Sequence, residues 1–552
     1  MSQEDLYRSG VQAFNAGAFE RAYEALRTLS HPQAAHLAAI SAQKTGRMSD
    51  AADLFLKASK LAPADPNIAN NFGHFLFSTG QLEAAAKQFS IALESAPNLA
   101  PALIGLAKIE AQHKNWDASG KLYERVLEAS PTSMVGQYGL ATALLETGKA
   151  NQAAPRFERV IAKNRSPEAI FMLGRTRLDQ GKQEEALSCF RDSYALAPSE
   201  HAFRNLANLL WMQGDTSAFD DLVDAAPAEL QSLAVTLLTE SGQLERAQRK
   251  WESLYSARPQ DVSAWLLKAN IARAQQDAEG LAGAADGALA LDPQSPSALD
   301  ARIVADLMLG RPKQALERVQ PLRRAAPHSQ HWIAHEFTAH RLMGTENAML
   351  DLDQFIGVYD IAAPPGYASI EAFNAELETA LKTLHSFQAR PLNQSLRGTG
   401  TQTTLSLSDV DHAVINTYVQ ALHAPIQDYL SRIGRDPAHP TAARNRDTYT
   451  IKGIWSILLR GGGFHEPHVH PDGWISSAYY VTVPAETKSA ADRAGWIGFG
   501  TPPYKLPEGA PETKWICPQP GRLVLFPSFL WHGTRPIADQ AERLTAPFDL
   551  IP

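Results

Sequence analysis

The chain contains few cysteines and no long apolar run. Cys189 and Cys517 are the two cysteines among 552 residues. Two cysteines this far apart in sequence exclude a disulfide framework and a thiolate zinc site, and they favour a reducing compartment. No run of about 18 apolar residues occurs, so the sequence predicts no membrane span. The acidic start without an apolar segment predicts no secretory signal. We therefore expect a cytoplasmic protein.

Basic residues are fewer than acidic ones. The 51 Lys and Arg residues stand against 59 Asp and Glu, for a formal net charge of -8, and the pI is about 6.1. Such a surface has no general attraction for nucleic acid or for an anionic membrane, so neither is an expected partner. The length exceeds that of one ordinary domain, which is about 150 residues, so internal repeats are the first pattern to seek.

A Gly-x-x-x-x-Ala pattern recurs through the first 345 residues. Bulky apolar residues such as Phe55 and Phe89 stand nine positions after most of these glycines, and Pro63, Pro97 and Pro131 are 34 residues apart. Glycine can end one helix in a left-handed conformation, alanine lets a second helix approach closely, and proline ends that second helix. The pattern therefore predicts helical hairpins, with the glycines at Gly17, Gly46, Gly80, Gly148, Gly181, Gly242 and Gly310.

This pattern resembles the tetratricopeptide repeat family, whose period is 34 residues. The resemblance covers about residues 3–345 and implies a superhelical solenoid whose concave face binds a protein or peptide. Asparagine amides on that face could pair with the backbone of an extended ligand, or they could be ordinary solvated positions. The asparagines in question are Asn70, Asn71, Asn205, Asn208 and Asn270.

The 34-residue period ends after Gly344, and the composition changes. We expect a linker and a connecting helix over residues 351–384. The polar segment His385–Thr403 has neither helical nor strand periodicity, and its length suggests a loop packed at a site. A helical pattern returns over Asp409–Ile433.

From Thr448 onward the sequence consists of short β-prone runs separated by turn signals. Strands at this spacing predict a jelly roll, also called a double-stranded β-helix. The fold class predicted is therefore multidomain, with an all-α solenoid over 1–350 and a β domain with flanking helices over 385–552. The predicted strands are Thr448–Leu459, Ile475–Val483, Gly495–Phe499, Lys514–Cys517, Arg522–Phe526 and Leu544–Ile551.

A histidine cluster lies within the β-rich region. His465, His468 and His470 fall within six positions, and His532 follows the last but one predicted strand. Side chains of residues i and i+2 in an extended segment point to the same side, so His468 and His470 can coordinate one metal ion. A jelly roll could bring His532 beside them. The spacing predicts a metal site of three histidines with open positions.

A candidate anion site follows the third histidine. Arg543 stands eleven residues after His532, and Thr545 lies two residues further on the same face of a predicted strand. A guanidinium beside a hydroxyl can hold a carboxylate.

The C-terminal region is similar to the 2-oxoglutarate/Fe(II)-dependent oxygenase superfamily, and within it to members found after tetratricopeptide repeats in bacteria. The similarity covers about residues 385–552. It implies Fe(II) and 2-oxoglutarate as cofactors, and a hydroxylation of an unactivated C–H bond that releases succinate. The stretches that carry it are 394–402, 468–481, 520–533 and 542–545.

The resemblance also implies roles for individual residues. His468 and His532 match the two metal histidines, and His470 falls where the wider superfamily has Asp or Glu. Arg543 matches the anchor of the distal carboxylate of 2-oxoglutarate. The implied catalytic residues are His468, His470, His532 and Arg543, and the implied cofactor-binding residues are Arg543, Thr545 and Tyr480.

The position of His470 leaves alternatives open for the third ligand. A frame shifted to His470-Pro471-Asp472 restores the His-x-Asp spacing, although Pro-Asp-Gly is a turn signal that would aim Asp472 into a loop. Glu466 is another possible carboxylate, and His465 could support the ligands from behind.

Three functions are consistent with these patterns. The first is an oxygenase that hydroxylates a protein or peptide held by the repeats. The second is an interaction scaffold whose β domain is a degenerate metal-binding module. The third is a three-histidine, cupin-like dioxygenase that needs no 2-oxoglutarate. Dependence on Arg543 separates the first from the third.

Overall fold

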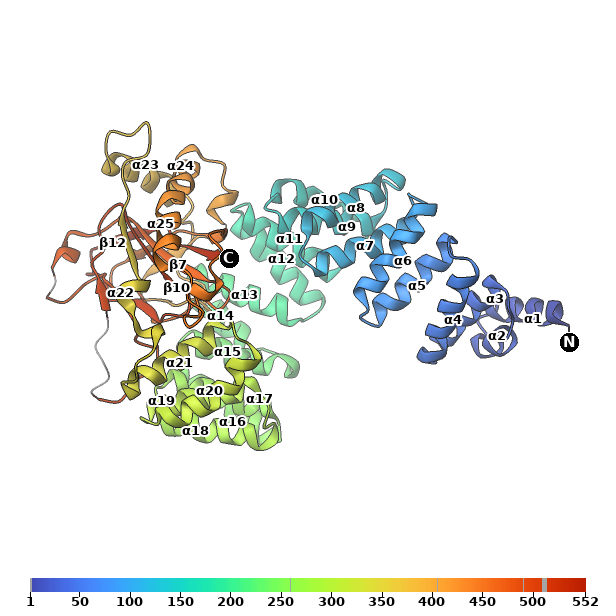
Figure 1. Cartoon of the computed structure of the whole chain (residues 1–552), viewed down its shortest axis with the longest axis horizontal. Helices are drawn as coiled ribbons and strands as arrows, with labels where there is room; N and C mark the ends of the chain where they lie inside the picture. The colour runs from blue at the N-terminus through green and yellow to red at the C-terminus, as the bar shows by residue number, and fades with distance from the viewer. Residues whose placement is uncertain (1, 259, 405, 490, 509–513) are drawn as a thin grey trace. The chain divides into compact units, whose positions relative to one another are not determined.

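The computed structural model describes residues 2–258, 260–404, 406–489, 491–508 and 514–552. The chain forms two compact units, Met1–Ala197 and Pro198–Pro552, coloured blue to teal and green to red in Figure 1. No helix within the described ranges combines the length and apolar character needed to cross a membrane.

The first unit consists of helices that pair as hairpins. Each glycine of the repeat pattern lies between the two helices of a hairpin with a positive φ, for example 78° at Gly46 and 77° at Gly80. Lys114 adopts the same left-handed conformation 34 residues after Gly80, in a hairpin that lacks the glycine. The predicted hairpins are confirmed. Their helices are α1 (Gln3–Asn15), α2 (Phe19–Leu26), α3 (Pro32–Lys44), α4 (Met48–Leu61), α5 (Pro66–Ser78), α6 (Leu82–Ser95), α7 (Ala100–Gln112), α8 (Trp116–Ala129), α9 (Met134–Glu146), α10 (Ala150–Lys163), α11 (Pro167–Asp179) and α12 (Gln183–Leu196).

Small residues make room for the aromatic side chain of each hairpin. Phe89 on α6 is fully buried. A Cβ added to Gly73 on α5 would come within 2.7 Å of its ring, and one added to Gly105 on α7 within 2.4 Å. Phe89 therefore fills the gap between its own hairpin and the next, as the sequence pattern predicts.

The second unit begins with further hairpins of the same kind. Gly242 and Gly310 have positive φ, and Gln276 replaces glycine with a φ of 58°. These helices are α13 (Glu200–Met212), α14 (Thr216–Asp224), α15 (Gln231–Glu240), α16 (Leu244–Ala257), α17 (Val262–Ala274), α18 (Ala278–Leu291), α19 (Pro296–Met308), α20 (Pro312–Ala325) and α21 (Gln330–Met343).

The β domain contains a large and a small antiparallel sheet. In the large sheet the order is β1-β10-β7-β12-β5-β3, with β13 pairing β4 and β7, and in the small sheet it is β11-β8-β9. From β7 the chain passes to β8 and β9 of the small sheet, returns to β10, and then crosses to β11 and back to β12. The Phe499 and Phe526 rings contact across the two sheets with centroids 4.9 Å apart. This is the predicted jelly roll. Its strands are β1 (Gly357–Asp360), β2 (Leu396–Arg397), β3 (Gly400–Gln402), β4 (Thr450–Ile454), β5 (Ile457–Arg460), β6 (Phe464–His465), β7 (Ile475–Thr482), β8 (Ile497–Phe499), β9 (Lys514–Ile516), β10 (Arg522–Pro527), β11 (His532–Thr534), β12 (Glu542–Thr545) and β13 (Phe548–Ile551).

Two predicted strands are divided in the structure. The run Thr448–Leu459 forms β4 and β5, and the run Leu544–Ile551 forms β12 and β13. Both breaks occur together, because the N–H of Trp455 donates to the carbonyl of Pro547, which itself has no N–H for a ladder. The two runs pair with each other on both sides of the break, β5 with β12 and β4 with β13.

Helices cover the outer face of the large sheet, and the last repeat helices of the second unit share a core with the rest of the β domain. Helices α23 (Ile370–Lys382), α24 (Ala413–Ala421) and α25 (His423–Ile433) share an apolar core with β7, β10 and β12, and they lie beside the sheet in Figure 1. The short helix α22 (Leu352–Phe355) and strand β1 lie in the stretch predicted as linker and connecting helix, and β1 pairs with β10. The domain bounds taken from the sequence remain a prediction.

Helix α21 joins the core of the β domain and fixes a segment next to the histidine cluster. The indole Nε1 of Trp531 donates to Thr338 Oγ1 at 3.0 Å and contacts the Ala334 carbonyl at 3.3 Å. Phe337 packs near Phe529. The last repeat helix therefore positions the chain immediately before His532.

Candidate active site

Backbone pairing brings His468 and His532 together. Their N–H and C=O groups exchange two hydrogen bonds of 3.0 Å, as an isolated antiparallel bridge. Gly533 permits this approach, since a Cβ there would lie 2.8 Å from the Pro467 nitrogen and 2.9 Å from the His465 carbonyl oxygen. The small sheet therefore sets the distance between two histidines that are far apart in sequence.

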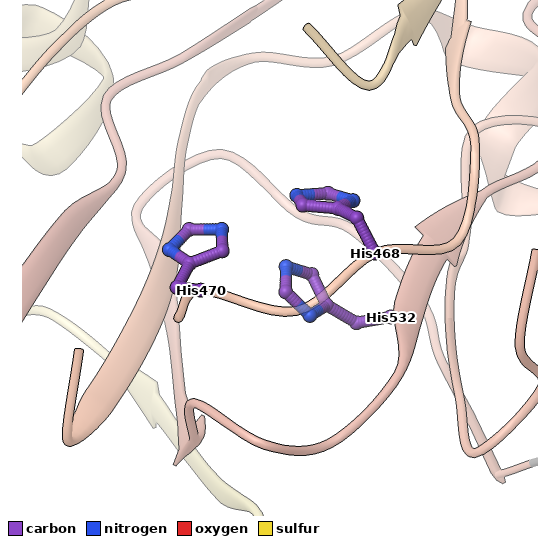
Figure 2. Close-up of side chains that lie close together, drawn as sticks. All are labelled: His468, His470 and His532. Atoms are coloured by element: carbon purple, nitrogen blue, oxygen red, sulfur yellow. The ribbon is translucent and has the colours of Figure 1, made fainter. Parts of the chain in front are cut away.

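The three predicted ligands surround one point. The centroids of His468 and His532 are 4.2 Å apart, and each lies 5.1 Å from that of His470. One ligand atom from each ring lies within 4.8 Å of the others. Figure 2 shows the three rings gathered around a common space, with two of them on one loop.

Each of the three imidazoles uses Nδ1 for a hydrogen bond. Nδ1 of His468 lies 2.9 Å from the Glu466 carbonyl oxygen, and Nδ1 of His532 lies 2.9 Å from that of Leu530. A carbonyl accepts only, so Nδ1 carries the proton and Nε2 keeps its lone pair. These are the tautomers that a metal ion requires, and backbone acceptors that fix them are usual behind metal-binding histidines.

His470 has a carboxylate partner instead of a carbonyl. Its Nδ1 lies 2.6 Å from Asp549 Oδ1 and 2.8 Å from Oδ2, and Ser476 Oγ also donates to Asp549 at 2.7 Å. A carboxylate behind an imidazole orients the ring and makes it a stronger donor to a metal. Sequence reasoning missed Asp549, which is 79 residues from His470. Its position on β13, opposite Ser476 of β7, is a matter of strand register.

The other carboxylates considered from the sequence are paired elsewhere. Asp472 contacts Lys452 at 3.0 Å and its side chain is 85% exposed, while Glu466 contacts Arg397 at 2.6 Å. Neither contributes to the group of candidate ligand atoms within the described residues.

Burial keeps the central imidazoles neutral. It lowers the pKa of His468 to about 3 and the pKa of His532 well below 6.5, and repulsion from neighbouring histidines adds to the effect. Neutral imidazole is the form that binds metal ions. The chemistry of this donor set fits a divalent transition metal such as Fe(II).

The residues predicted to hold 2-oxoglutarate lie beside the histidines with unsatisfied polar atoms. Arg543 is 2% exposed, and its Nη1 donates to the Gly495 carbonyl at 2.7 Å. Within the described part of the chain, Arg543 Nε and the Tyr480 hydroxyl are buried without a hydrogen-bond partner. Thr545 pairs with Tyr480 across β12 and β7. Buried polar groups are normally satisfied, so these atoms suit a polar ligand.

A cavity of about 590 Å³ connects these groups. It is lined by the three histidines together with Tyr480, Arg543 and Thr545, and Ile457, Val469 and Ile497 add apolar surface. His465 also lines it, with Nδ1 held by Ser395 Oγ at 3.0 Å. His465 Nε2 is buried and finds no partner among the described residues, so His465 offers another group to a ligand.

The polar segment predicted as a loop at a site contacts both the repeats and the cavity. The Leu392 N–H donates to Asn208 Oδ1 on α13 at 2.9 Å. The Gln388 and Ala389 N–H groups donate to the Met212 carbonyl. The next residues, Asn393–Ser395, line the cavity. Helix α13 thus binds a backbone segment that leads to the candidate site.

The other asparagines have separate roles. Asn70 donates to Asn71, whose amide contacts His36, and Asn205 donates to the His201 carbonyl on its own helix. Asn270 lines a second, smaller cavity. Of the five, Asn208 accepts a hydrogen bond from a backbone N–H outside its own helix, and that N–H belongs to Leu392 of the chain itself.

Comparison with known families agrees with both resemblances. Residues 453–549 match the family described as "Putative 2OG-Fe(II) oxygenase". Residues 71–133, 138–201, 171–230 and 233–296 match the tetratricopeptide repeat. The chain therefore carries tetratricopeptide repeats followed by a domain of this oxygenase family.

Individual proteins and solved structures are similar to parts of the chain. The "Protein CTR9 homolog" of Arabidopsis thaliana is 25% identical over 192 residues, which are 34% of this chain and 18% of that protein. YrrB, "a TPR protein with an unusual peptide-binding site", is 25% identical with a TM-score of 0.28, covering 31% of this chain and 90% of its own. A tetratricopeptide repeat protein from Parabacteroides merdae is 15% identical with a TM-score of 0.35, covering 50% and 98%.

Proposed function

We propose that this chain is a 2-oxoglutarate- and Fe(II)-dependent oxygenase that hydroxylates a protein or peptide. One observation carries the proposal: a buried arginine and a buried tyrosine present unsatisfied polar atoms beside three convergent histidines. A buried guanidinium keeps its charge, so an anionic ligand offsets the cost of its burial. A dicarboxylate that also chelates the metal meets both requirements.

The residues divide into two groups. His468, His470 and His532 would hold Fe(II), each through Nε2. Arg543 would bind the distal carboxylate of 2-oxoglutarate through Nε and the free face of its guanidinium, with hydroxyls from Thr545 and Tyr480. When bound, the iron and 2-oxoglutarate supply the oxidation of a C–H bond by O₂, with release of CO₂ and succinate.

The rest of the cavity wall orients and protects these groups. Burial raises the pKa of Tyr480 to about 12, so its hydroxyl stays protonated and can donate to a carboxylate. Ile457, Val469 and Ile497 limit the access of water to the ligand. Gly495 fixes the guanidinium of Arg543 through its carbonyl, which orients the remaining N–H groups before the ligand arrives.

A macromolecular substrate is favoured by the contacts of the segment Gln388–Leu392. Asn208 and the Met212 carbonyl bind backbone N–H groups, and main-chain contacts of this kind recognise a peptide without regard to its sequence. The bound segment runs directly to the cavity rim at Asn393. A substrate peptide held in a similar manner would reach the metal with one side chain.

The test is binding and turnover of 2-oxoglutarate by the full chain. Anaerobic addition of 2-oxoglutarate to the Fe(II)-loaded protein should give the weak visible charge-transfer band of the chelate, and aerobic turnover should release succinate. Arg543→Gln should weaken 2-oxoglutarate binding by about 100-fold or more, since it removes a buried charge partner. Arg460→Gln is a matched control. Arg460 lies on β5, which pairs with the strand β12 that carries Arg543, and it is partly exposed and forms an ion pair with Glu542.

Two results would contradict the proposal. One is a metal-loaded protein that binds no 2-oxoglutarate. The other is equal loss of binding in the Arg543 and Arg460 variants. A three-histidine dioxygenase is the second candidate, favoured by the imidazole of His470 where a carboxylate is usual. It predicts O₂ consumption without succinate, unaffected by Arg543→Gln.

A further inference from the structure

A second convergent group of ligand atoms lies among the repeat helices. Asp300 comes from α19, and His331 and His335 come from α21. Asp300 Oδ1 lies 2.5 Å from His331 Nε2 and 2.9 Å from His335 Nε2. Histidines four residues apart share one face of a helix, and here they face the neighbouring repeat. The three ligand atoms lie within 4.8 Å of one another.

The surrounding contacts orient these ligands. His335 Nδ1 lies 3.2 Å from the Tyr504 hydroxyl of the β domain, and Arg273 Nη2 on α17 contacts Asp300 Oδ2 at 2.5 Å. The guanidinium opposes a cation by its charge, but it engages the other carboxylate oxygen and leaves Oδ1 to the imidazoles. Partners behind the ligands are typical of metal centres.

One side of the group is open. A cavity of about 390 Å³ is lined by Asn270, Arg273, Ser297, Asp300, His331 and Trp332. Three protein ligands and an accessible side leave a coordination position for water or for a donor atom of a bound partner. The cavity is separate from the one that contains His468, with which it shares no lining residue.

We propose that Asp300, His331 and His335 form a second metal site, which binds a divalent transition-metal ion such as Zn(II) and keeps one position open to the cavity. Two imidazoles and a carboxylate are a common donor set for such ions. The site links α19, α21 and, through Tyr504, the β domain. It is independent of the function proposed for the jelly roll.

Metal stoichiometry of the full chain tests this site. Co(II) serves as the probe, with visible d–d absorption and elemental analysis as readouts. The intact chain should bind two equivalents. His331→Ala and His468→Ala should each bind one, and they should lose different absorption bands. His340→Ala is the matched control on α21, since His340 is partly exposed and contacts Thr345, and it should still bind two.

The proposal is overturned if the intact chain binds one equivalent and His468→Ala binds none, because the cluster is then a hydrogen-bond network without metal. It is also overturned if His331→Ala retains both equivalents. Thermal unfolding of His468→Ala with and without Zn(II) gives a second measurement that needs no change in the cluster. Zn(II) at 100 times its Kd should raise the stability by about 2.7 kcal/mol, and no shift in Tm at any Zn(II) concentration contradicts the site.

Discussion

Replacing Asp549 with asparagine tests whether His470 completes the proposed metal site. The carboxylate of Asp549 contacts His470 Nδ1 through both oxygens, at 2.6 and 2.8 Å, and its side chain is 13% exposed. Asparagine keeps the shape and removes the charge. The ring of His470 then loses the anionic partner that orients it and strengthens Nε2 as a donor.

The expected magnitude follows from the place of Asp549 behind a ligand. Loss of such a partner lowers metal affinity by about 10- to 100-fold, which corresponds to about 1.4–2.8 kcal/mol. Solvent screening is small at this burial, so we expect the upper part of the range. Ser476→Ala removes a hydrogen bond from a neutral hydroxyl to the same carboxylate and should cost less than Asp549→Asn, which removes the charge itself.

The assay is an anaerobic Fe(II) or Co(II) titration in the His331→Ala background, which leaves one candidate centre. Asp472→Asn is the control, because Asp472 is exposed, pairs with Lys452 and is the alternative ligand from the shifted frame. We expect its affinity to be unchanged. The reasoning is refuted if Asp472→Asn weakens binding while Asp549→Asn does not, since His470 and Asp472 would then be the ligand pair.

Two further predictions concern stability. Gly139→Ala places a Cβ 2.2 Å from the ring of Tyr123 and should destabilise the first unit by about 1–3 kcal/mol. Gly283→Ala meets no described atom within 4 Å and should stabilise its helix by up to about 1 kcal/mol. Thermal unfolding measures both changes, and equal effects on stability would contradict the packing around Gly139. His439 is buried, its Nδ1 accepts two backbone N–H groups, and burial lowers its pKa to about 4. In the unfolded chain His439 binds a proton near pH 6.5, but in the folded chain it does not. The stability therefore falls as the pH drops from 6.5 toward 4, by up to about 3 kcal/mol. Urea midpoints should show a smaller loss in His439→Gln, and an identical pH dependence of the variant would exclude His439 as a cause.

Local patterns could be predicted because their causes are local. The glycines at the hairpin turns, the alanines five residues later and the buried aromatics follow from helix geometry within a single repeat. Even so, Lys114 and Gln276 show that the left-handed turn forms without glycine, since the packing of both helices compensates for the strain. A search for glycine alone misses those hairpins.

Strand partners could not be predicted with the same success. Thr448–Leu459 and Leu544–Ile551 read as continuous β-prone runs, but each is interrupted near Trp455 and Pro547, where the two runs face each other. The pairing of β1 with β10 joins residues that are more than 160 positions apart. Strand propensity depends on neighbours that the local sequence does not contain.

The sequence by itself determined the repeat architecture and the candidate residues His468, His470, His532, Arg543 and Thr545, because short spacings and residue chemistry mark them. The tertiary structure alone decided what stands around them. Strand register placed Asp549 behind His470 and turned Asp472 toward Lys452. Helix packing brought Asp300 to His331 and His335, and it set Trp531 against α21. These contacts join residues from separate elements, and the burial that gives them their strength exists only in the folded chain.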